Sequence, residues 1–200
     1  CGSMHPEFVG QTVVEHGADV GIALDGDGDR VIMVNANGAV VNGDELLYVI
    51  ATARQDKGLL KGGVVGTVMS NLGLELALKK RDIPFLRTPV GDRHVHKALV
   101  SNSWTLGGEA SGHLLCLDRT STGDGIVSAL QILEVIVSTG RSLAELSADM
   151  QKLPQTMINV PIKKWNNGQG GAYITDSKTI SAAVESLAGL IRSSGSSTNR

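Results

Sequence analysis

The feature that most constrains this 200-residue chain is a short acidic loop between two apolar runs. The loop Asp25–Arg30 reads Asp-Gly-Asp-Gly-Asp-Arg, and the flanking runs Val20–Leu24 and Val31–Val34 predict buried strands. Its three carboxylates stand at alternate positions and can turn toward one hard cation such as Mg2+, because the intervening glycines let the backbone curl. An arginine directly after them suits a phosphate that meets the metal. The candidate metal ligands are Asp25, Asp27 and Asp29, with Arg30 beside them.

Two other interpretations of the acidic loop compete with a magnesium site. Asp and Gly both favour turns, so the segment also fits a solvated acidic turn. A calcium-binding EF-hand fails on spacing. Counted from Asp25, the sixth position is Arg30 where that motif has Gly, and the twelfth is Ala36 where it has Glu. Metal chemistry on a phosphorylated substrate is the favoured interpretation.

Composition argues against several classes of protein. Hydrophobic residues make up 42% of the chain and aromatic residues only 3%, so the core must rest on Val, Ile, Leu and Ala. The net charge of −2 and the lack of a basic block argue against a nucleic-acid partner. No apolar run is long enough to span a bilayer and no signal-peptide pattern is present, so we expect no membrane partner. Cys1 and Cys116 form no framework or metal motif, which fits a reduced, cytoplasmic setting.

Helical and strand patterns alternate along the chain, which predicts an α/β layered domain with a mixed or mainly parallel sheet. Helix patterns cover residues 6–16, 44–55, 71–78, 93–99, 123–137 and 142–150. Strand patterns cover 20–24, 31–34, 64–68, 104–106 and 114–117, and residues 35–38 have hairpin-turn chemistry. After a break near Pro154 we expect a strand at 155–163, a flexible connection at 166–171, a helix at 177–190 and a mobile tail at 193–198.

A second group of polar residues lies in the segment Gly107–His113. Glu109, Ser111 and His113 stand at alternating positions and can project from one side of an extended loop. Such a set offers both the donors and the acceptors that sugar hydroxyls need. The plainer interpretation makes Glu109 a surface charge and His113 a satisfied histidine at a strand edge.

A third group lies in the segment Thr88–His94. Gly91 frees the backbone, Asp92 can cap a helix and Arg93 can meet a phosphate. Simple helix capping is the alternative, and the segment taken alone does not separate the two.

Taken together, five segments resemble the α-D-phosphohexomutase superfamily, and within it the phosphoglucosamine mutases. In order along the chain they are residues 25–30, 65–71, 90–93, 108–113 and 122–125. The resemblance implies that Asp25, Asp27 and Asp29 bind Mg2+, and that Arg30, Arg93 and His113 serve catalysis. It further implies a substrate-binding set, which consists of Gly91, Asp92, Arg93, Glu109, Ser111, His113, Arg192, Ser194 and Gly195.

The resemblance also implies a division into domains, although the chain departs from the family pattern at both ends. We expect residues 1–36 to be the C-terminal part of domain II, 37–153 to be the three-layer mixed-sheet domain III, and 154–200 to be a truncated start of domain IV. The chain does not begin with Met and has no Thr-Ala-Ser-His-Asn-like phosphoserine motif, so we expect a fragment. The phosphate loop near its end keeps Arg192, Ser194 and Gly195 but loses the family's Glu and Pro.

For the complete enzyme, the resemblance implies interconversion of glucosamine 6-phosphate and glucosamine 1-phosphate, through a phosphoserine and a sugar bisphosphate. This reaction leads to UDP-N-acetylglucosamine and the bacterial cell wall. We expect Mg2+ as cofactor, a phosphorylated hexosamine and a sugar bisphosphate as small-molecule partners, and leave open a homodimer of the full-length enzyme. The fragment alone is expected to be inactive. The alternatives are phosphomannomutase or phosphoglucomutase activity, or a non-catalytic module that binds a sugar phosphate.

Overall fold

The computed structural model describes residues 2–156. The chain divides into two compact units, Cys1–Gln155 and Thr156–Arg200, and everything below concerns the first. The helix expected at 177–190, the phosphate-loop residues Arg192, Ser194 and Gly195, and nearly all of the strand expected at 155–163 lie outside the described residues. Within the described part, no helix combines the length and the apolar character that crossing a membrane requires.

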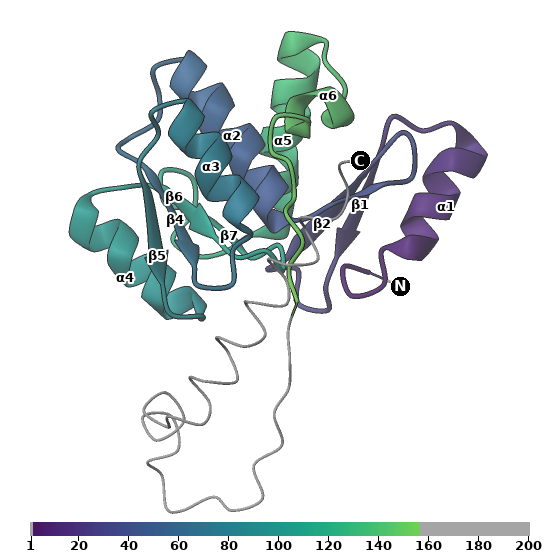
Figure 1. Ribbon diagram of the computed structural model, residues 1–200. Helices are drawn as coiled ribbons and strands as arrows, with labels where there is room; N and C mark the ends of the chain where they lie inside the picture. Colours follow the sequence, from purple (N-terminus) through teal and green to yellow (C-terminus); the bar gives the residue numbers. More distant parts are fainter. Residues whose placement is uncertain (1, 157–200) are drawn as a thin grey trace, which may run out of the picture. The chain divides into compact units, whose positions relative to one another are not determined.

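A small antiparallel sheet carries the acidic loop. It has the strand order β1-β2-β3, with β1 at Val20–Leu24, β2 at Val31–Asn35 and β3 at Val40–Val41. Helix α1, Glu7–His16, packs on it (Figure 1). The helix approaches closely because Gly21 has no side chain, and a β-carbon there would meet Val9 and Val13 at 2.6 and 2.7 Å. The acidic loop is the β1–β2 connection, as the sequence predicts.

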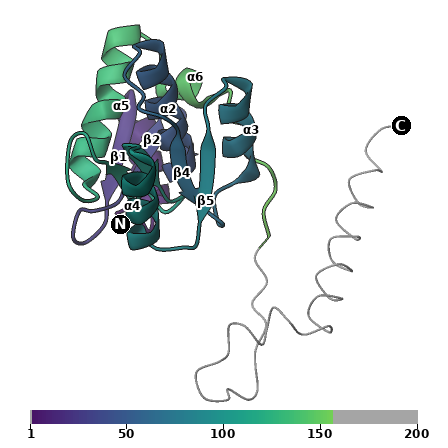
Figure 2. The ribbon, with the colours of Figure 1, turned by 90° about the vertical axis from the view of Figure 1, so that its left-hand side faces the viewer.

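A larger, four-stranded sheet has the strand order β5-β4-β6-β7 and forms the central layer between helices. Strand β4 pairs in parallel with β5 and β6, and β7 returns antiparallel to β6. Helices α2 and α3 cover one face and α4 the other, so the expected α/β fold with a mixed sheet in three layers is confirmed (Figure 2). The elements are α2 Gly43–Asp56, β4 Val64–Thr67, α3 Leu72–Lys80, β5 Phe85–Thr88, α4 Asp92–Asn102, β6 Leu106–Gly108, β7 Leu114–Cys116, α5 Gly125–Thr139 and α6 Leu143–Ser147.

Capping side chains mark where several of these helices begin. Asn42 and Glu45 form a reciprocal capping box at the start of α2, and Ser142 and Glu145 form another at α6. Asp124 accepts a hydrogen bond from the Val127 amide and caps α5. These caps satisfy backbone donors that the first turn of a helix leaves free.

One hydrophobic core joins the two sheets. The side chains of β2, which is buried along its whole length, meet those of α2 and α5 in the same cluster as β6 and β7. A smaller cluster lies under α4 and contains Val65, Val95, Leu99 and Leu115. The shared core therefore fixes the acidic loop against the end of the larger sheet.

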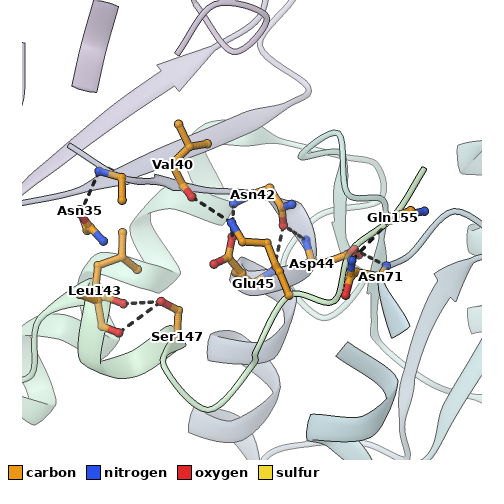
Figure 3. A network of polar contacts seen from close by, with 12 residues as sticks. Asn35, Val40, Asn42, Asp44, Glu45, Asn71, Leu143, Ser147 and Gln155 are labelled. Atoms are coloured by element: carbon orange, nitrogen blue, oxygen red, sulfur yellow. Dashed lines mark hydrogen bonds and ion pairs between the residues drawn. The ribbon is translucent and has the colours of Figure 1, made fainter. Parts of the chain in front are cut away.

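A polar network fastens the segment after α6 to the ends of α2 and α3 (Figure 3). The Asn71 side chain accepts a hydrogen bond from the Leu153 amide at 2.9 Å and donates one to the Leu153 carbonyl at 2.8 Å. The Asn71 side chain also caps α3 by accepting from the Gly73 amide, and the Asn71 backbone amide donates to the buried carboxyl of Asp44 at 2.7 Å. Lys152 adds an ion pair with Glu45 at 2.9 Å.

The structure corrects several expectations about elements. Strands β3 and β5 were not predicted, because β3 has only two residues and β5 is a four-residue edge strand that contains Arg87. The strand expected at 104–106 instead covers Leu106–Gly108, the three residues that pair with β7. Strand β1 is not wholly buried, because Ile22 is 40% exposed. Helix α6 ends at Ser147 rather than at residue 150.

Candidate metal centre and the loops around it

The acidic loop gathers its three carboxylates at one point. One oxygen from each of Asp25, Asp27 and Asp29 lies within 4.8 Å of the others. The Arg30 amide donates to Asp25 Oδ1 at 3.1 Å, which closes the loop on itself. The Arg30 side chain lies alongside, with Nε 3.6 Å from Asp25 Oδ2 and 3.8 Å from Asp29 Oδ1.

The electrostatics of these carboxylates fit a hard divalent cation. Asp29 Oδ1 is buried and has no hydrogen-bond partner among the described residues. Burial, together with the neighbouring Asp25 and Asp27 carboxylates, raises the pKa of Asp29 despite the opposing effect of His113. Partial burial by itself would raise the pKa of Asp25. Hydrogen bonds from the Arg30 amide and from Asp29 outweigh this effect and hold the pKa of Asp25 below its ordinary value. Converging anionic oxygens of this kind are the ligands that Mg2+ prefers.

The loop that contains His113 is joined directly to the acidic loop. Arg30 and His113 form an antiparallel backbone bridge, and the Val31 amide donates to the Gly112 carbonyl at 3.0 Å. The His113 side chain is buried, with Nε2 3.8 Å from Asp29 Oδ2. Two segments more than 80 residues apart therefore share one site.

Residues 109–113 form a tight hairpin turn, and the expected extended loop with three side chains on one side is wrong. The Glu109 amide donates to the His113 carbonyl and the Gly112 amide to the Glu109 carbonyl, each at 3.0 Å. This turn separates the side chains. Glu109 Oε1 accepts from the Gly91 amide at 2.9 Å, whereas His113 faces Asp29 and Ser111 is exposed.

The third polar segment begins helix α4, but not as the capping interpretation predicts. The cap position is Gly91, without a side-chain cap, and Asp92 is the first helical residue. Gly91 has φ 122°, a backbone conformation that glycine adopts readily and other residues rarely do. In this conformation its backbone N–H points toward the Glu109 carboxylate. Arg93 is exposed, and no ion pair to it is found within residues 2–156.

The three segments predicted to carry chemistry thus meet through specific contacts. The backbone bridge at Arg30 links the first to the second, and the Glu109–Gly91 hydrogen bond links the second to the third. Sequence reasoning did not identify these contacts, because each joins residues far apart along the chain. For residues 122–125 it gave a helix start and a match to the superfamily, but not their contact with the acidic loop.

Comparison with known proteins agrees with this fold and these motifs. The sequence-family model for phosphoglucomutase/phosphomannomutase, α/β/α domain III, matches residues 42–153. The chain therefore belongs to this family. A phosphoglucosamine mutase from Thioalkalivibrio sulfidiphilus is 54% identical over 195 residues, which cover 98% of this chain and 43% of that protein. The expected relationship to phosphoglucosamine mutases is therefore confirmed, and the chain spans less than half the length of the curated relative.

Solved structures show the same fold. A putative phosphomannomutase from Thermus thermophilus has a TM-score of 0.65 at 28% identity and covers 72% of this chain and 34% of its own. An Aspergillus fumigatus N-acetylphosphoglucosamine mutase, solved with GlcNAc-6P and magnesium, has a TM-score of 0.59 at 20% identity. The alignment with it covers 77% of this chain and 38% of that one. Phosphohexomutases with this fold thus include one whose structure contains both a sugar phosphate and magnesium.

Proposed function

We propose that this chain is the metal-binding and sugar-binding part of a phosphoglucosamine mutase. In this proposal Asp25, Asp27 and Asp29 hold one Mg2+, and the complete enzyme interconverts glucosamine 6-phosphate and glucosamine 1-phosphate through a phosphoserine and a sugar bisphosphate. The observation that carries it is the convergence of the three carboxylates beside the His113 hairpin. The similarity to phosphoglucosamine mutases supports the choice of substrate.

The chain's own residues suit the binding of a phosphorylated sugar. Arg30 keeps a partly exposed guanidinium beside the carboxylates, where a phosphate that meets the metal can pair with it. Arg93 offers a second exposed guanidinium at the start of α4. Mg2+ at the acidic loop supplies a Lewis acid that offsets charge on the transferred phosphoryl group.

Glu109 is the residue placed best to recognise the sugar. One of its oxygens is engaged by the Gly91 amide, which fixes the carboxylate and leaves Oε2 available to a hydroxyl. Ser111, exposed at the tip of the hairpin, adds a donor and an acceptor. In this proposal Gly91 and Asp92 also belong to the substrate-binding set, and His113 faces Asp29, with Nε2 3.8 Å from Asp29 Oδ2.

The metal part of the proposal is tested by calorimetric titration of Mg2+ into the 200-residue chain and into Asp27→Asn. Asp27 is exposed, so the substitution removes a ligand charge with little effect on packing. We expect one ion per chain and binding weakened by at least about tenfold in the variant. Asp19→Asn, an exposed carboxyl outside the loop, is the matched control and should bind as the unsubstituted chain does. Equal affinity of Asp27→Asn and the control would remove the metal assignment.

A further inference from the structure

The turn at residues 122–125 packs against both the acidic loop and the His113 ring, without any side chain between them. Gly123 and Gly125 are both buried. A β-carbon on Gly123 would overlap the His113 imidazole at Nε2 and Cδ2. A β-carbon on Gly125 would lie 2.9 Å from the Gly28 carbonyl oxygen and 2.8 Å from that of Arg30, the two residues that flank Asp29.

Backbone conformation does not explain these glycines. Neither has a positive φ, so other residues could adopt the same dihedral angles. The start of α5 is already provided by Asp124, whose side chain caps the helix. What requires glycine at both positions is space, because the His113 ring fills the place of a side chain at Gly123, and backbone together with Leu24 Cδ2 at 2.7 Å fills it at Gly125.

Each of the two glycines contacts a group that adjoins Asp29. The Gly125 amide donates to the Gly28 carbonyl at 2.9 Å and so anchors the backbone just before Asp29. Gly123 lies against the Nε2–Cδ2 edge of the His113 ring, and the same Nε2 is 3.8 Å from Asp29 Oδ2. We infer that Gly123 and Gly125 are positioning residues that set Asp29 for metal binding, Gly123 through the His113 ring and Gly125 through the loop backbone. This inference rests on the metal site of the proposed function.

The first test measures Mg2+ affinity by calorimetry in Gly123→Ala. The added methyl must displace the His113 ring from Asp29, and altered outer-shell partners commonly weaken metal binding by about 10-fold or more. Gly63→Ala is the matched control. It crowds Pro84 and Trp104 beside the start of β4, away from the acidic loop, and should leave the affinity unchanged. Equal affinity of Gly123→Ala and the unsubstituted chain overturns this inference alone. No binding by the unsubstituted chain overturns the metal site and the inference together.

The second test determines whether a side chain at position 123 is excluded by the His113 ring. Urea denaturation midpoints are compared for Gly123→Ala alone, His113→Ala alone and the double variant. The alanine at 123 should lower the midpoint when His113 is present and have little effect when the ring is removed, because the space is then free. If Gly123→Ala fails to fold, the double variant should still fold. An equal loss in both backgrounds, or a double variant that does not fold, overturns the inference.

Discussion

Asp44 is a fully buried carboxyl at the start of α2. Its Oδ2 accepts from the Asn71 amide, while Oδ1 is buried without a partner among the described residues. Burial raises the pKa of Asp44, against the opposing effects of the Asn71 hydrogen bond and the nearby Arg87 charge. A carboxyl whose pKa is raised by folding binds its proton more tightly in the native state. Its ionisation therefore costs stability as the pH rises from the unfolded value of about 4 through the folded pKa.

We therefore expect Asp44→Asn to change how stability depends on pH. The amide oxygen can still accept from Asn71, but it does not ionise. Relative to the unsubstituted chain, the variant should become more stable, with a larger free energy of unfolding, as the pH is raised from about 4 to about 7. Urea denaturation at a series of pH values measures this difference, with the exposed Asp149→Asn as control. Parallel curves for Asp44→Asn and the unsubstituted chain would show that the burial of Asp44 does not couple to pH.

At the scale of single residues, contacts between near neighbours in the sequence could be predicted. The alternation of Asp and Gly predicts convergent carboxylates, and one oxygen of each does lie close to the others. That Asp25, Asp27 and Asp29 bind Mg2+ stays a prediction. The partner of Glu109 and the contact of Gly123 with the His113 ring could not be predicted, because both depend on how the sheet brings distant segments together.

At the scale of elements, long periodic helices and hydrophobic strands were predicted well. Helix α2 buries Leu46, Leu47 and Ile50 as its periodicity indicates, but it buries the residues between them as well, because α3, α5 and α6 also pack on it. Strand β5 was missed because it is short, lies at an edge and carries Arg87, which reaches back to the Thr67 and Ser70 carbonyls. The hairpin at 109–113 was mistaken for an extended loop because its turn is set by pairing of β6 with β7, which no local signal reports.

Asn71 connects three elements, and its truncation should affect more than the helix it caps. Asn71→Ala removes the α3 cap and both hydrogen bonds to Leu153, so we expect a loss of about 2 kcal/mol in the free energy of unfolding. Hydrogen exchange should become faster at residues 151–155, which Asn71 holds in place. Ser142→Ala removes a cap that ties down no other segment and should leave exchange at 151–155 unchanged. Unaltered exchange there in Asn71→Ala would mean that other contacts hold the segment.

At the scale of the whole described unit, the acidic loop proposed to bind Mg2+ and the hairpin proposed to face the sugar lie on one shared core. The core joins both sheets, so the distance between Asp29 and the His113 hairpin is set by packing rather than by loop sequence. The proposed reaction also needs a phosphoserine, and the sequence contains no segment resembling that motif. Without a phosphoserine there is no phosphoryl donor beside the sugar, so the metal and the arginines have no phosphoryl transfer to assist.

The most direct measurement of the central claim is an assay in a full-length framework. The 200 residues replace the matching segment of the Thioalkalivibrio sulfidiphilus phosphoglucosamine mutase, and turnover is followed with Mg2+ and a sugar bisphosphate. We predict conversion of glucosamine 6-phosphate at a higher kcat/KM than that of glucose or mannose phosphates. Glu109→Ala in this graft should lower that value by about 10-fold or more, because one oriented hydrogen bond to the sugar is lost, while Mg2+ affinity is retained. The 200-residue chain alone should show no turnover. Preference for glucose or mannose phosphate, or a folded graft without mutase activity, would contradict the assignment.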